Sequence, residues 1–492
     1  MNGTQPPGPG NKRTLQFKNW VSLSGGVVVI GSMFSFVFLI AMDMVSHHGN
    51  PYMGILAYVV APVFFSLGMV LLVVGALIHR KRTKGGMIPR AFTFDLTRKT
   101  DRRTMGIFVA GAVVFLLVSA MGSYNTYHYT ESVNFCGTAC HTPMKPEYTA
   151  YQNSAHARVA CTECHVGAGA EYYVKSKISG VRQLYGVMTD TYHRPIQTPV
   201  HNMRPAQETC EQCHWPNKYV GEVDRTYSHF LADATNTPYT VRLILKVGGA
   251  DASHGPTGGI HWHMNVANKI EYVASDPQHQ SIPWVRLTAP DGKVTEFRTK
   301  AFTNSPSQVV RRMDCMDCHN RPAHDFNPPS AAVDLALSLG KIDASMPWVK
   351  SNAVTALVGT YNTEDEAMAK IDSFLRATYK ASPKADQLVA AVQDIYKKNF
   401  FPEMKSDWRV YPNNIGHKNW AGCFRCHDGL HKSEDGKHKI EASTCNACHT
   451  IVAQGAGPQL DHMEGKGLDF FHIDANYSDF SCNNCHTGAF TK

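Results

Sequence analysis

Every cysteine in this chain belongs to a pair that is followed directly by a histidine. Two residues separate the cysteines in six of the pairs, and three residues separate them in the first pair. The cysteines are Cys136/Cys140, Cys161/Cys164, Cys210/Cys213, Cys315/Cys318, Cys423/Cys426, Cys445/Cys448 and Cys482/Cys485, and the histidines that follow are His141, His165, His214, His319, His427, His449 and His486. Two thiols at the common spacing can form thioether bonds to one porphyrin, and the next residue then delivers an imidazole to the iron. Disulfides and zinc sites use similar spacings, but a pattern that consumes every cysteine favours covalent haem. The sequence therefore predicts seven covalently bound haems c.

Three apolar stretches near the N-terminus, at about 21–45, 53–78 and 105–123, have roughly the length needed to cross ~30 Å of hydrocarbon. The first is longer than the core of a signal peptide, and a second follows closely, so it predicts an anchor. Lysine and arginine precede the first stretch and cluster between the second and third, whereas the loop between the first two has neither. Positive charge marks the cytoplasmic side. We therefore expect a cytoplasmic N-terminus in the bacterial inner membrane and a periplasmic haem domain after about Tyr124.

The basic character of the chain belongs to its cytoplasmic loops. Residues 1–104 hold 12 Lys and Arg against 3 Asp, so the formal net charge of +8 leaves −1 for the rest. Two propionates on each haem make the exported part more negative still. This balance predicts no nucleic-acid partner, and it favours a periplasmic cytochrome or reductase with a positive patch as the electron acceptor.

The spacing of the motifs predicts a membrane anchor and a mostly helical or irregular, haem-packed exported domain with a small β insertion. Val241–Val247, Trp284–Thr288 and Val294–Arg298 are rich in strand formers, and Asp291-Gly292 is a hairpin signal. Thr363 with Glu366 and, later, Ser382-Pro383 are typical of helix starts. We expect segments at 1–124 (anchor), 125–220 (haems 1–3), 221–310 (β-rich insertion), 311–328 (haem 4), 329–414 (helical insertion) and 415–492 (haems 5–7).

The second axial position of each iron decides its function, because histidine there favours electron transfer, methionine raises the potential and an open position permits catalysis. Seven histidines lie where distal ligands are expected: His156, His193, His201, His324, His417, His431 and His472. His261 and His263 alternate along an expected strand and would face the same side, and they are weaker candidates. In the first motif Met144 follows the histidine by three positions, so either His141 or Met144, or neither, could bind that iron.

Four ordered motifs between about 105 and 220 resemble those of NapC/NirT/NrfH-type membrane quinol dehydrogenases. They read CGTACHTPM, SAHARVACTECHVG, RQLYGVMTD and NMRPAQETCEQCH. The resemblance implies that Met144 is an axial ligand of haem 1, that Asp190 is the carboxylate near the quinol, and that Lys177 and Arg182 are its basic neighbours. It also implies that His156 is a distal ligand. Three spans and seven haems resemble inner-membrane heptahaem cytochromes of the ImcH type more than NapC itself.

These observations predict a membrane cytochrome that oxidises quinol at a membrane-edge haem and passes electrons to periplasmic acceptors. Quinol releases two protons with its two electrons, so Asp190 would serve as the base. One alternative is an electron-wire subunit of a larger respiratory complex without its own quinol site. The other is a terminal reductase of the nitrite or hydroxylamine type, in which one haem keeps an open position.

Overall fold

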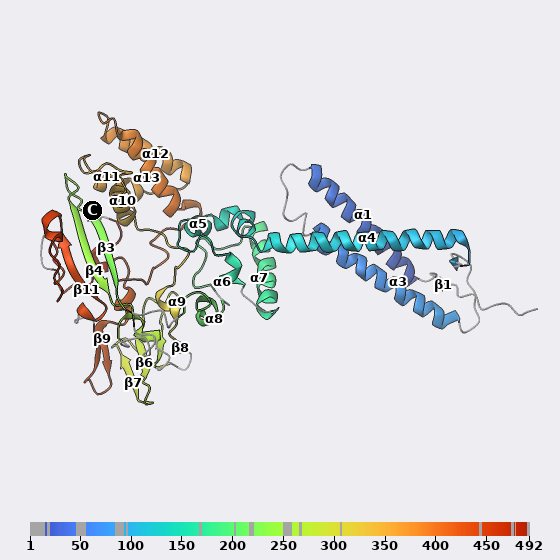
Figure 1. Cartoon of the computed structure of the whole chain (residues 1–492), viewed down its shortest axis with the longest axis horizontal. Helices are drawn as coiled ribbons and strands as arrows, with labels where there is room; N and C mark the ends of the chain where they lie inside the picture. Colours follow the sequence, from blue (N-terminus) through green and yellow to red (C-terminus); the bar gives the residue numbers. More distant parts are fainter. Residues whose placement is uncertain are drawn as a thin grey trace, which may run out of the picture. The chain divides into compact units, whose positions relative to one another are not determined.

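The computed structural model describes residues 15–16, 20–45, 56–83, 93–94, 97–166, 170–200, 203–215, 221–248, 258–264, 268–305, 308–441, 445–473, 477 and 479–489. The chain divides into two compact units, Met1–Ala139 and Cys140–Lys492 (Figure 1).

Three long helices make up most of the first unit. They are α1 (Trp20–Val45), α3 (Ala61–Thr83, entered through a π-helical turn at Leu56–Val60) and α4 (Lys99–Thr130), with a short pairing of β1 (Leu15–Gln16) and β2 (Thr93–Phe94). Among the described residues, the stretches long and apolar enough to cross a membrane are Trp20–Ala41, Leu56–His79 and Lys99–Thr130. The three predicted spans are confirmed, although the third helix begins earlier than its apolar part.

The helices of the first unit pack closely but keep apolar side chains on their outer faces. A Cβ added at Gly25 would lie 2.8 Å from the carbonyl oxygen of Gly68, so the glycines let α1 and α3 approach each other. Phe36, Phe65 and Phe115 form the centre of the contact among the three helices. Large apolar side chains such as Ile30, Val63 and Leu117 are exposed. This outward-facing apolar surface suits lipid.

The second unit contains two antiparallel sheets. In the first, β4 (Pro238–Leu245) lies between β3 (Val223–Phe230) and β11 (His449–Gly455). The second has the order β10-β9-β7-β6-β5-β8 and consists of β5 (Lys269–Val273), β6 (Trp284–Thr288), β7 (Val294–Arg298), β8 (Arg311–Arg312), β9 (Asp428–Ser433) and β10 (Lys439–Glu441). Both sheets therefore combine the β-rich insertion with strands from the C-terminal haem region, which the sequence did not predict.

The β-rich insertion forms the hairpin that its sequence predicts. β6 and β7 have the bounds expected for them, and Thr288 pairs with Val294 across the turn. Gly292 adopts a φ of +81°, a left-handed conformation that favours glycine.

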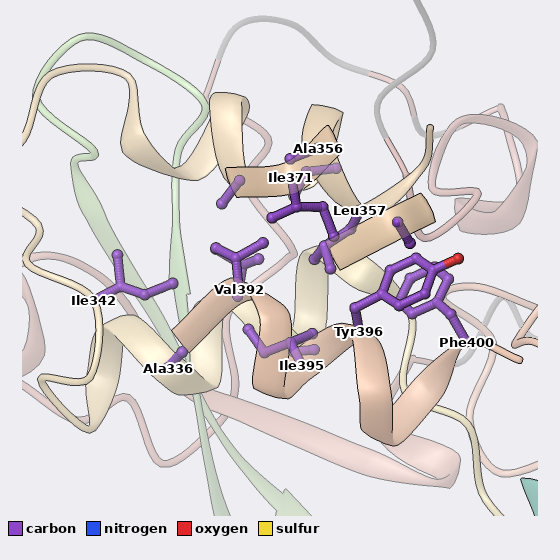
Figure 2. Packing of buried hydrophobic residues seen from close by; sticks show 14 of the residues in the cluster. Ala336, Ile342, Ala356, Leu357, Ile371, Val392, Ile395, Tyr396 and Phe400 are labelled. Carbon is purple, nitrogen blue, oxygen red and sulfur yellow. The ribbon is translucent and has the colours of Figure 1, made fainter. Parts of the chain in front are cut away.

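The helical insertion builds the largest side-chain core in the described structure (Figure 2). Its helices are α10 (Pro329–Ser338), α11 (Val349–Leu357), α12 (Glu364–Thr378) and α13 (Ala385–Asn399). Leu357, Ile371 and Val392 are fully buried, and the ring of Tyr396 stacks on that of Phe400 at 4.8 Å between centroids. The core therefore gives the haem region a rigid side-chain scaffold of its own.

The start of α12 matches its prediction, and the start of α13 does not. The Thr363 side chain accepts a hydrogen bond from the backbone N–H of Glu366 at 3.1 Å, as an N-cap should. Ser382 instead accepts from the backbone N–H of Lys384 at 3.2 Å, and α13 begins at Ala385. The predicted start at Pro383 was wrong because Ser382 forms a turn before the helix rather than its cap.

Candidate haem-binding site

The regular cysteine motifs fold into single helical turns. The backbone N–H of the motif histidine donates to the carbonyl oxygen of the first cysteine in the third, fourth, fifth and seventh motifs, at 2.8, 2.8, 3.0 and 2.8 Å. The second motif is itself a helix, α6 (Cys161–His165). In a helical turn residues three and four apart lie on one face. In the regular motifs whose side chains are described, the two thiols and the histidine therefore point to the same side, as attachment of one porphyrin and its iron requires.

These turns lie at six places in the second unit. They occur on α6, at the end of α8 (Ala206–Cys210), on α9 (Cys315–Cys318), on η7 (Gly422–Arg425), on η8 (Cys445–Ala447) and on α14 (Cys482–Cys485). In the fourth motif Asp314 caps the turn, since its side chain accepts from the backbone N–H of Met316 at 2.8 Å. Short capped turns let the chain present a haem ligand without a long helix.

The described attachment cysteines differ in exposure. The side chains of Cys213, Cys423 and Cys485 are exposed, whereas those of the other described cysteines are partly buried. Cys213 lies in the turn that follows the end of α8 at Cys210, near Trp215 in the sequence, which is 51% exposed. The third motif therefore lies at the surface of the unit, and attachment of a haem at Cys213 stays a prediction.

The first motif accommodates its extra residue in a π-helical turn. A π-helical turn covers Phe135–Ala139, directly before α5 (His141–Gln152). A π-turn takes up one more residue than an α-turn, which accommodates the third residue between Cys136 and Cys140. His141 and Met144 both lie in the first turn of α5, on one side of the helix. They are therefore alternatives for one side of an iron rather than a pair across it.

Each of the other six motif histidines faces a second histidine ring. The pairs and their centroid separations are His165–His324 (6.1 Å), His214–His156 (5.9 Å), His319–His261 (6.3 Å), His427–His263 (5.8 Å), His449–His417 (6.2 Å) and His486–His472 (6.0 Å). Two imidazoles that bind one metal from opposite sides, each through a nitrogen at about 2 Å, have centroids about 6 Å apart. The six pairs fit haems with two axial histidines.

In four of the paired histidines the second ring nitrogen shows the pattern expected of metal ligands, whereas Nδ1 of His417 and of His449 is buried without a partner among the described residues. The Nδ1 of His156 donates to the carbonyl oxygen of Pro322 at 3.0 Å, and that of His324 to the carbonyl of Glu147 at 2.9 Å. His261 and His263 donate in the same way to the carbonyls of Val247 and Ile260, at 2.7 and 2.8 Å. A ligating histidine almost always uses its other nitrogen like this, because the bond fixes the ring and its tautomer. In these four histidines Nε2 would be the nitrogen that binds a metal.

Burial favours the neutral form of seven of the paired imidazoles. Burial lowers the pKa of His165, His261, His319, His417, His427, His449 and His486 below the usual histidine value. A neutral imidazole has the lone pair that a metal requires. These positions therefore favour ligation over protonation.

His261 and His263 were weak candidates in the sequence, and the expectation that they share one strand face was wrong. They lie in a 3₁₀ turn, η5 (Ile260–Met264). With three residues per turn, side chains two apart point in different directions. The two histidines therefore serve two different motifs, those of His319 and His427, and join the fourth and fifth sites. An alternating His-x-His pattern on its own does not distinguish a strand from such a turn.

His431 is a correction to the predicted ligands. Its ring is fully buried in β9, Nδ1 lies 2.8 Å from Oδ1 of Asp428, and Nε2 lies 2.6 Å from the carbonyl oxygen of Ile282. Both ring nitrogens have partners within the protein, so neither is directed to an iron. His431 ties β9 to the segment before β6, and the ring that faces His427 is that of His263.

Two further predicted ligands are not placed in a pair. His193 is exposed, and within the described residues it faces no motif histidine. His201 lies outside the residues that the structure describes, as does the side chain of Cys445.

The predicted quinol residues lie on and after α7 (Ala170–Met188). Asp190 follows the end of the helix in a left-handed conformation, with φ at +54°, which aspartate tolerates better than most residues. Its Oδ1 accepts a hydrogen bond from Arg194 at 2.5 Å, and Arg194 also donates to the hydroxyl of Tyr192 at 2.6 Å. The ionic partner of Asp190 is therefore Arg194, which the sequence did not single out, while Lys177 and Arg182 lie on the helix before it.

The sites follow one another in space in the order of the sequence. The thiol of Cys210 in the third motif lies within hydrogen-bonding distance of Cys315 in the fourth. Electrostatic contacts between cysteines link the second motif with the third, the fourth with the fifth and the fifth with the sixth, through Cys164/Cys213, Cys318/Cys423 and Cys423/Cys448. Lys418, next to His417 of the sixth site, lies near His486 of the seventh. Haems held at the second to seventh motifs would therefore follow one another in the order of the sequence.

Comparison with known proteins identifies the family. Residues 98–208 match the model of the NapC/NirT cytochrome c family, N-terminal region. The chain is 39% identical over 491 residues to the cytochrome c-type protein ImcH of Geobacter sulfurreducens, covering 96% of this chain and 95% of that protein. It is 24% identical over 335 residues to cytochrome c-552 of Haemophilus influenzae, covering 60% of this chain and 59% of that protein. No solved structure matches the chain significantly. With its three apolar helices, its haem motifs and its full-length similarity to ImcH, the chain belongs to the ImcH-like, NapC/NirT-type family of membrane-anchored multihaem cytochromes c and acts in electron transfer.

Proposed function

We propose that this cytochrome oxidises membrane quinol at its first haem and delivers the electrons through six further haems to a soluble redox protein. Haem supplies one-electron transfer at each site. The residues of the chain supply the ligands, a lipid-facing surface beside the quinol and a base for its protons. The observation that carries the quinol step is the outer surface of α7, which leads directly to Asp190.

An apolar stripe runs along the exposed face of α7. Its members are spaced three or four positions apart and are 53–78% exposed: Val174, Ile178, Val181, Tyr185 and Met188. Residues at this spacing share one helix face. Lys175, Lys177 and Arg182 flank the stripe on its two sides. An apolar face bordered by cations is typical of a helix that lies at the surface of a membrane. We propose that α7 contacts lipid in this way.

This orientation brings Asp190 to the lipid boundary, where quinol is dissolved. The carboxylate is exposed, and Arg194 holds it in a fixed position. Quinol oxidation releases protons as well as electrons, so a positioned carboxylate at this boundary can accept the proton. Met144 on α5 is the proposed axial ligand of the haem that accepts the electron, because a thioether raises the potential of the iron.

The haem count and the topology are part of the same proposal. Six histidine pairs support haems 2–7, and the π-turn of the first motif supports a seventh. Intact mass spectrometry should show seven haem additions, and six or fewer would contradict the count. Protease applied outside spheroplasts should digest the segment after Tyr124 and spare the basic segment between α3 and α4. Digestion of that segment instead would reverse the orientation.

The seventh site is the proposed point of electron delivery. Phe471 and Ile473, on either side of the ligand His472, are 60% and 45% exposed, and Phe480 is 63% exposed. Four exposed acids and one exposed lysine, Lys466, lie in the same stretch of the chain, and the acids are Asp461, Glu464, Asp469 and Asp479. An apolar centre with an acidic rim fits a soluble cytochrome whose haem edge is surrounded by lysines.

Two changes of charge test this partner. Asp469→Lys with Asp479→Lys should weaken binding of a basic c-type cytochrome and reduce the salt dependence of that binding, because complementary charges at an exposed rim are screened by salt. Glu434→Lys, at an exposed site on the loop after β9, is the matched control. Equal weakening by the control variant would place the docking surface elsewhere.

The experiment for the quinol step compares the two faces of α7. Ile178→Asp with Val181→Asp should slow reduction of the haems by a quinol analogue in proteoliposomes, because it places charge on the lipid-facing stripe. Gln183→Asp, on the opposite face, should leave the rate unchanged. Reduction by dithionite should be complete in every variant. Equal quinol rates in all variants would favour the electron-wire alternative, in which another subunit oxidises quinol.

The terminal-reductase alternative receives less support. Six sites have histidine rings on both sides, so haems bound there are six-coordinate and cannot bind a substrate.

A further inference from the structure

A cavity of about 220 Å³ lies beside the seventh haem motif. It is lined by Cys485 and His486 on one side and by Ser330, Lys418 and Asn419 on the other. The C-terminal segment is fastened there, because the backbone N–H of Ser330 donates to the carbonyl oxygen of Gly488 at 2.9 Å. The cavity is therefore built from the haem 7 attachment turn, the first turn of α10 and the loop that carries the ligand His417.

The polar groups behind this cavity carry an excess of positive charge. The carboxylate of Asp334 is buried and lies 2.7 Å from Nζ of Lys350. It also accepts from the backbone N–H of Phe230 at 3.1 Å and lies 3.2 Å from Nδ1 of His229. The Lys350–Asp334 pair is thus neutral and fully hydrogen-bonded, and it leaves no charge to balance a further cation.

Lys418 is that further cation. Its Nζ lies 3.5 Å from Nδ1 of His229, and within the described part of the chain it is within 4 Å of no carboxylate. Its side chain is exposed and lines the cavity. The first turn of α10, a helix of 10 residues, adds the positive end of its dipole to the same space.

A haem attached at Cys482 and Cys485 would bring its two propionate carboxylates to this cavity. We infer that Lys418 binds a propionate of haem 7 and thereby raises the reduction potential of that haem above what its two histidine ligands alone would give. Two observations support this inference. Lys418 has no carboxylate within 4 Å among the described residues, and the cavity joins Lys418 to the turn of the seventh haem motif. A higher potential at haem 7 draws electrons to the proposed point of delivery, so the inference deepens the proposed function and rests on it.

The test compares three variants of the full-length membrane protein with its haems attached. Lys418→Met removes the charge and keeps the length, and Lys418→Arg keeps the charge. Lys380→Met, at an exposed site of the helical insertion, is the matched control. Spectroelectrochemical titration gives the potentials, and the contribution of haem 7 is identified as the low-spin signal that His472→Ala removes. Mass spectrometry of each variant gives its haem content.

With all haems retained, Lys418→Met should lower the reduced-to-oxidised ratio of haem 7 at a fixed potential about tenfold, which equals about 59 mV for one electron. Lys418→Arg and Lys380→Met should remain close to the wild type. If Lys418→Met loses haem 7 and Lys418→Arg keeps it, the charge is needed for binding and the inference stands. An unchanged potential in Lys418→Met, or equal effects of Met and Arg, would overturn it. Failure of the quinol assay with a normal shift here would affect the proposed function alone.

Discussion

Replacing His431 with alanine should destabilise the protein without changing the ligation of any haem. The ring bonds the carboxylate of Asp428 and the carbonyl oxygen of Ile282, and it is fully buried. A hydrogen bond to a charged group contributes about 1.5–3 kcal/mol and a neutral one about 0.5–1.5 kcal/mol, so the loss should be about 2–4 kcal/mol. The cost arises because the buried carbonyl oxygen of Ile282 loses its donor, while Asp428 keeps only the backbone N–H donors of residues 430 and 431.

Two measurements separate this structural role from ligation. Urea unfolding should show a lower midpoint for His431→Ala than for wild type, with no change in His438→Ala, whose exposed ring has no such bonds. Electron paramagnetic resonance should show the same low-spin signals in His431→Ala as in wild type. In His263→Ala one low-spin signal should become high-spin, because that ring faces His427. If His431→Ala instead gave a high-spin haem while His263→Ala did not, the assignment of the fifth site would be refuted.

Three further outcomes follow from the structure. Met144→His should lower the potential of haem 1, which redox titration would show. Asp190→Asn should slow quinol oxidation in a turnover assay without changing the haem spectrum. Wild-type turnover in both variants would place electron input elsewhere. Arg321→Met should lower the free energy of unfolding in urea by about 3 kcal/mol, because it breaks the buried ion pair with Glu147. It should also disturb the haem 2 signal, because the backbone carbonyl of Glu147 orients His324. An unchanged unfolding midpoint would contradict this. Burial opposes ionisation of Glu271, but hydrogen bonds from Lys269 and Arg286 outweigh it and hold the pKa of Glu271 below its usual value. The ionised carboxylate therefore contributes to stability above about pH 4.3, and this contribution is lost as the pH falls through the lower folded pKa. Glu271→Gln should remove that part of the acid dependence from unfolding curves measured between pH 3 and 7, and an identical dependence in wild type and variant would count against the assignment.

Local features were predictable because they depend on neighbouring residues. The cysteine motifs, the three apolar spans and the hairpin of β6 and β7 each follow from spacing or alternation over a few positions. The capping residue Thr363 acts on the helix directly after it. The start of α13 predicted from Ser382 was wrong for a local reason as well, because a serine before a proline is also common in a turn.

The exposure of each attachment cysteine could not be predicted, because it depends on what packs against the motif. The third motif has the same spacing as the fourth, yet Cys213 is exposed and Cys318 is partly buried. The difference arises from the surroundings, since the fourth motif is covered by a segment from the C-terminal haem region, where Asn414 and Arg425 both donate to the carbonyl oxygen of Asp317. Those contacts join residues about 100 positions apart, which no motif spacing reveals.

Distal ligands depend on contacts between distant parts of the chain, and only some of them could be predicted. His156, His324, His417 and His472 were identified as candidates, yet which motif each faces depends on the fold, since His324 follows the fourth motif but faces the second. His431 follows a motif histidine by four positions, much as His324 follows one by five, and only its buried bonds show that it is structural. The strands β9 and β11 were missed for the same reason, because their partners lie far away in the sequence.

The most direct test of the account is reduction of the purified cytochrome by quinol alone. The protein would be placed in proteoliposomes with no other subunit, mixed with a reduced quinol analogue, and followed by stopped-flow absorbance of the haem bands with a basic soluble cytochrome as acceptor. The account predicts that quinol reduces the haems and that the acceptor then draws electrons from them, with turnover slowed in Asp190→Asn. Haems that dithionite reduces but quinol leaves oxidised would contradict it.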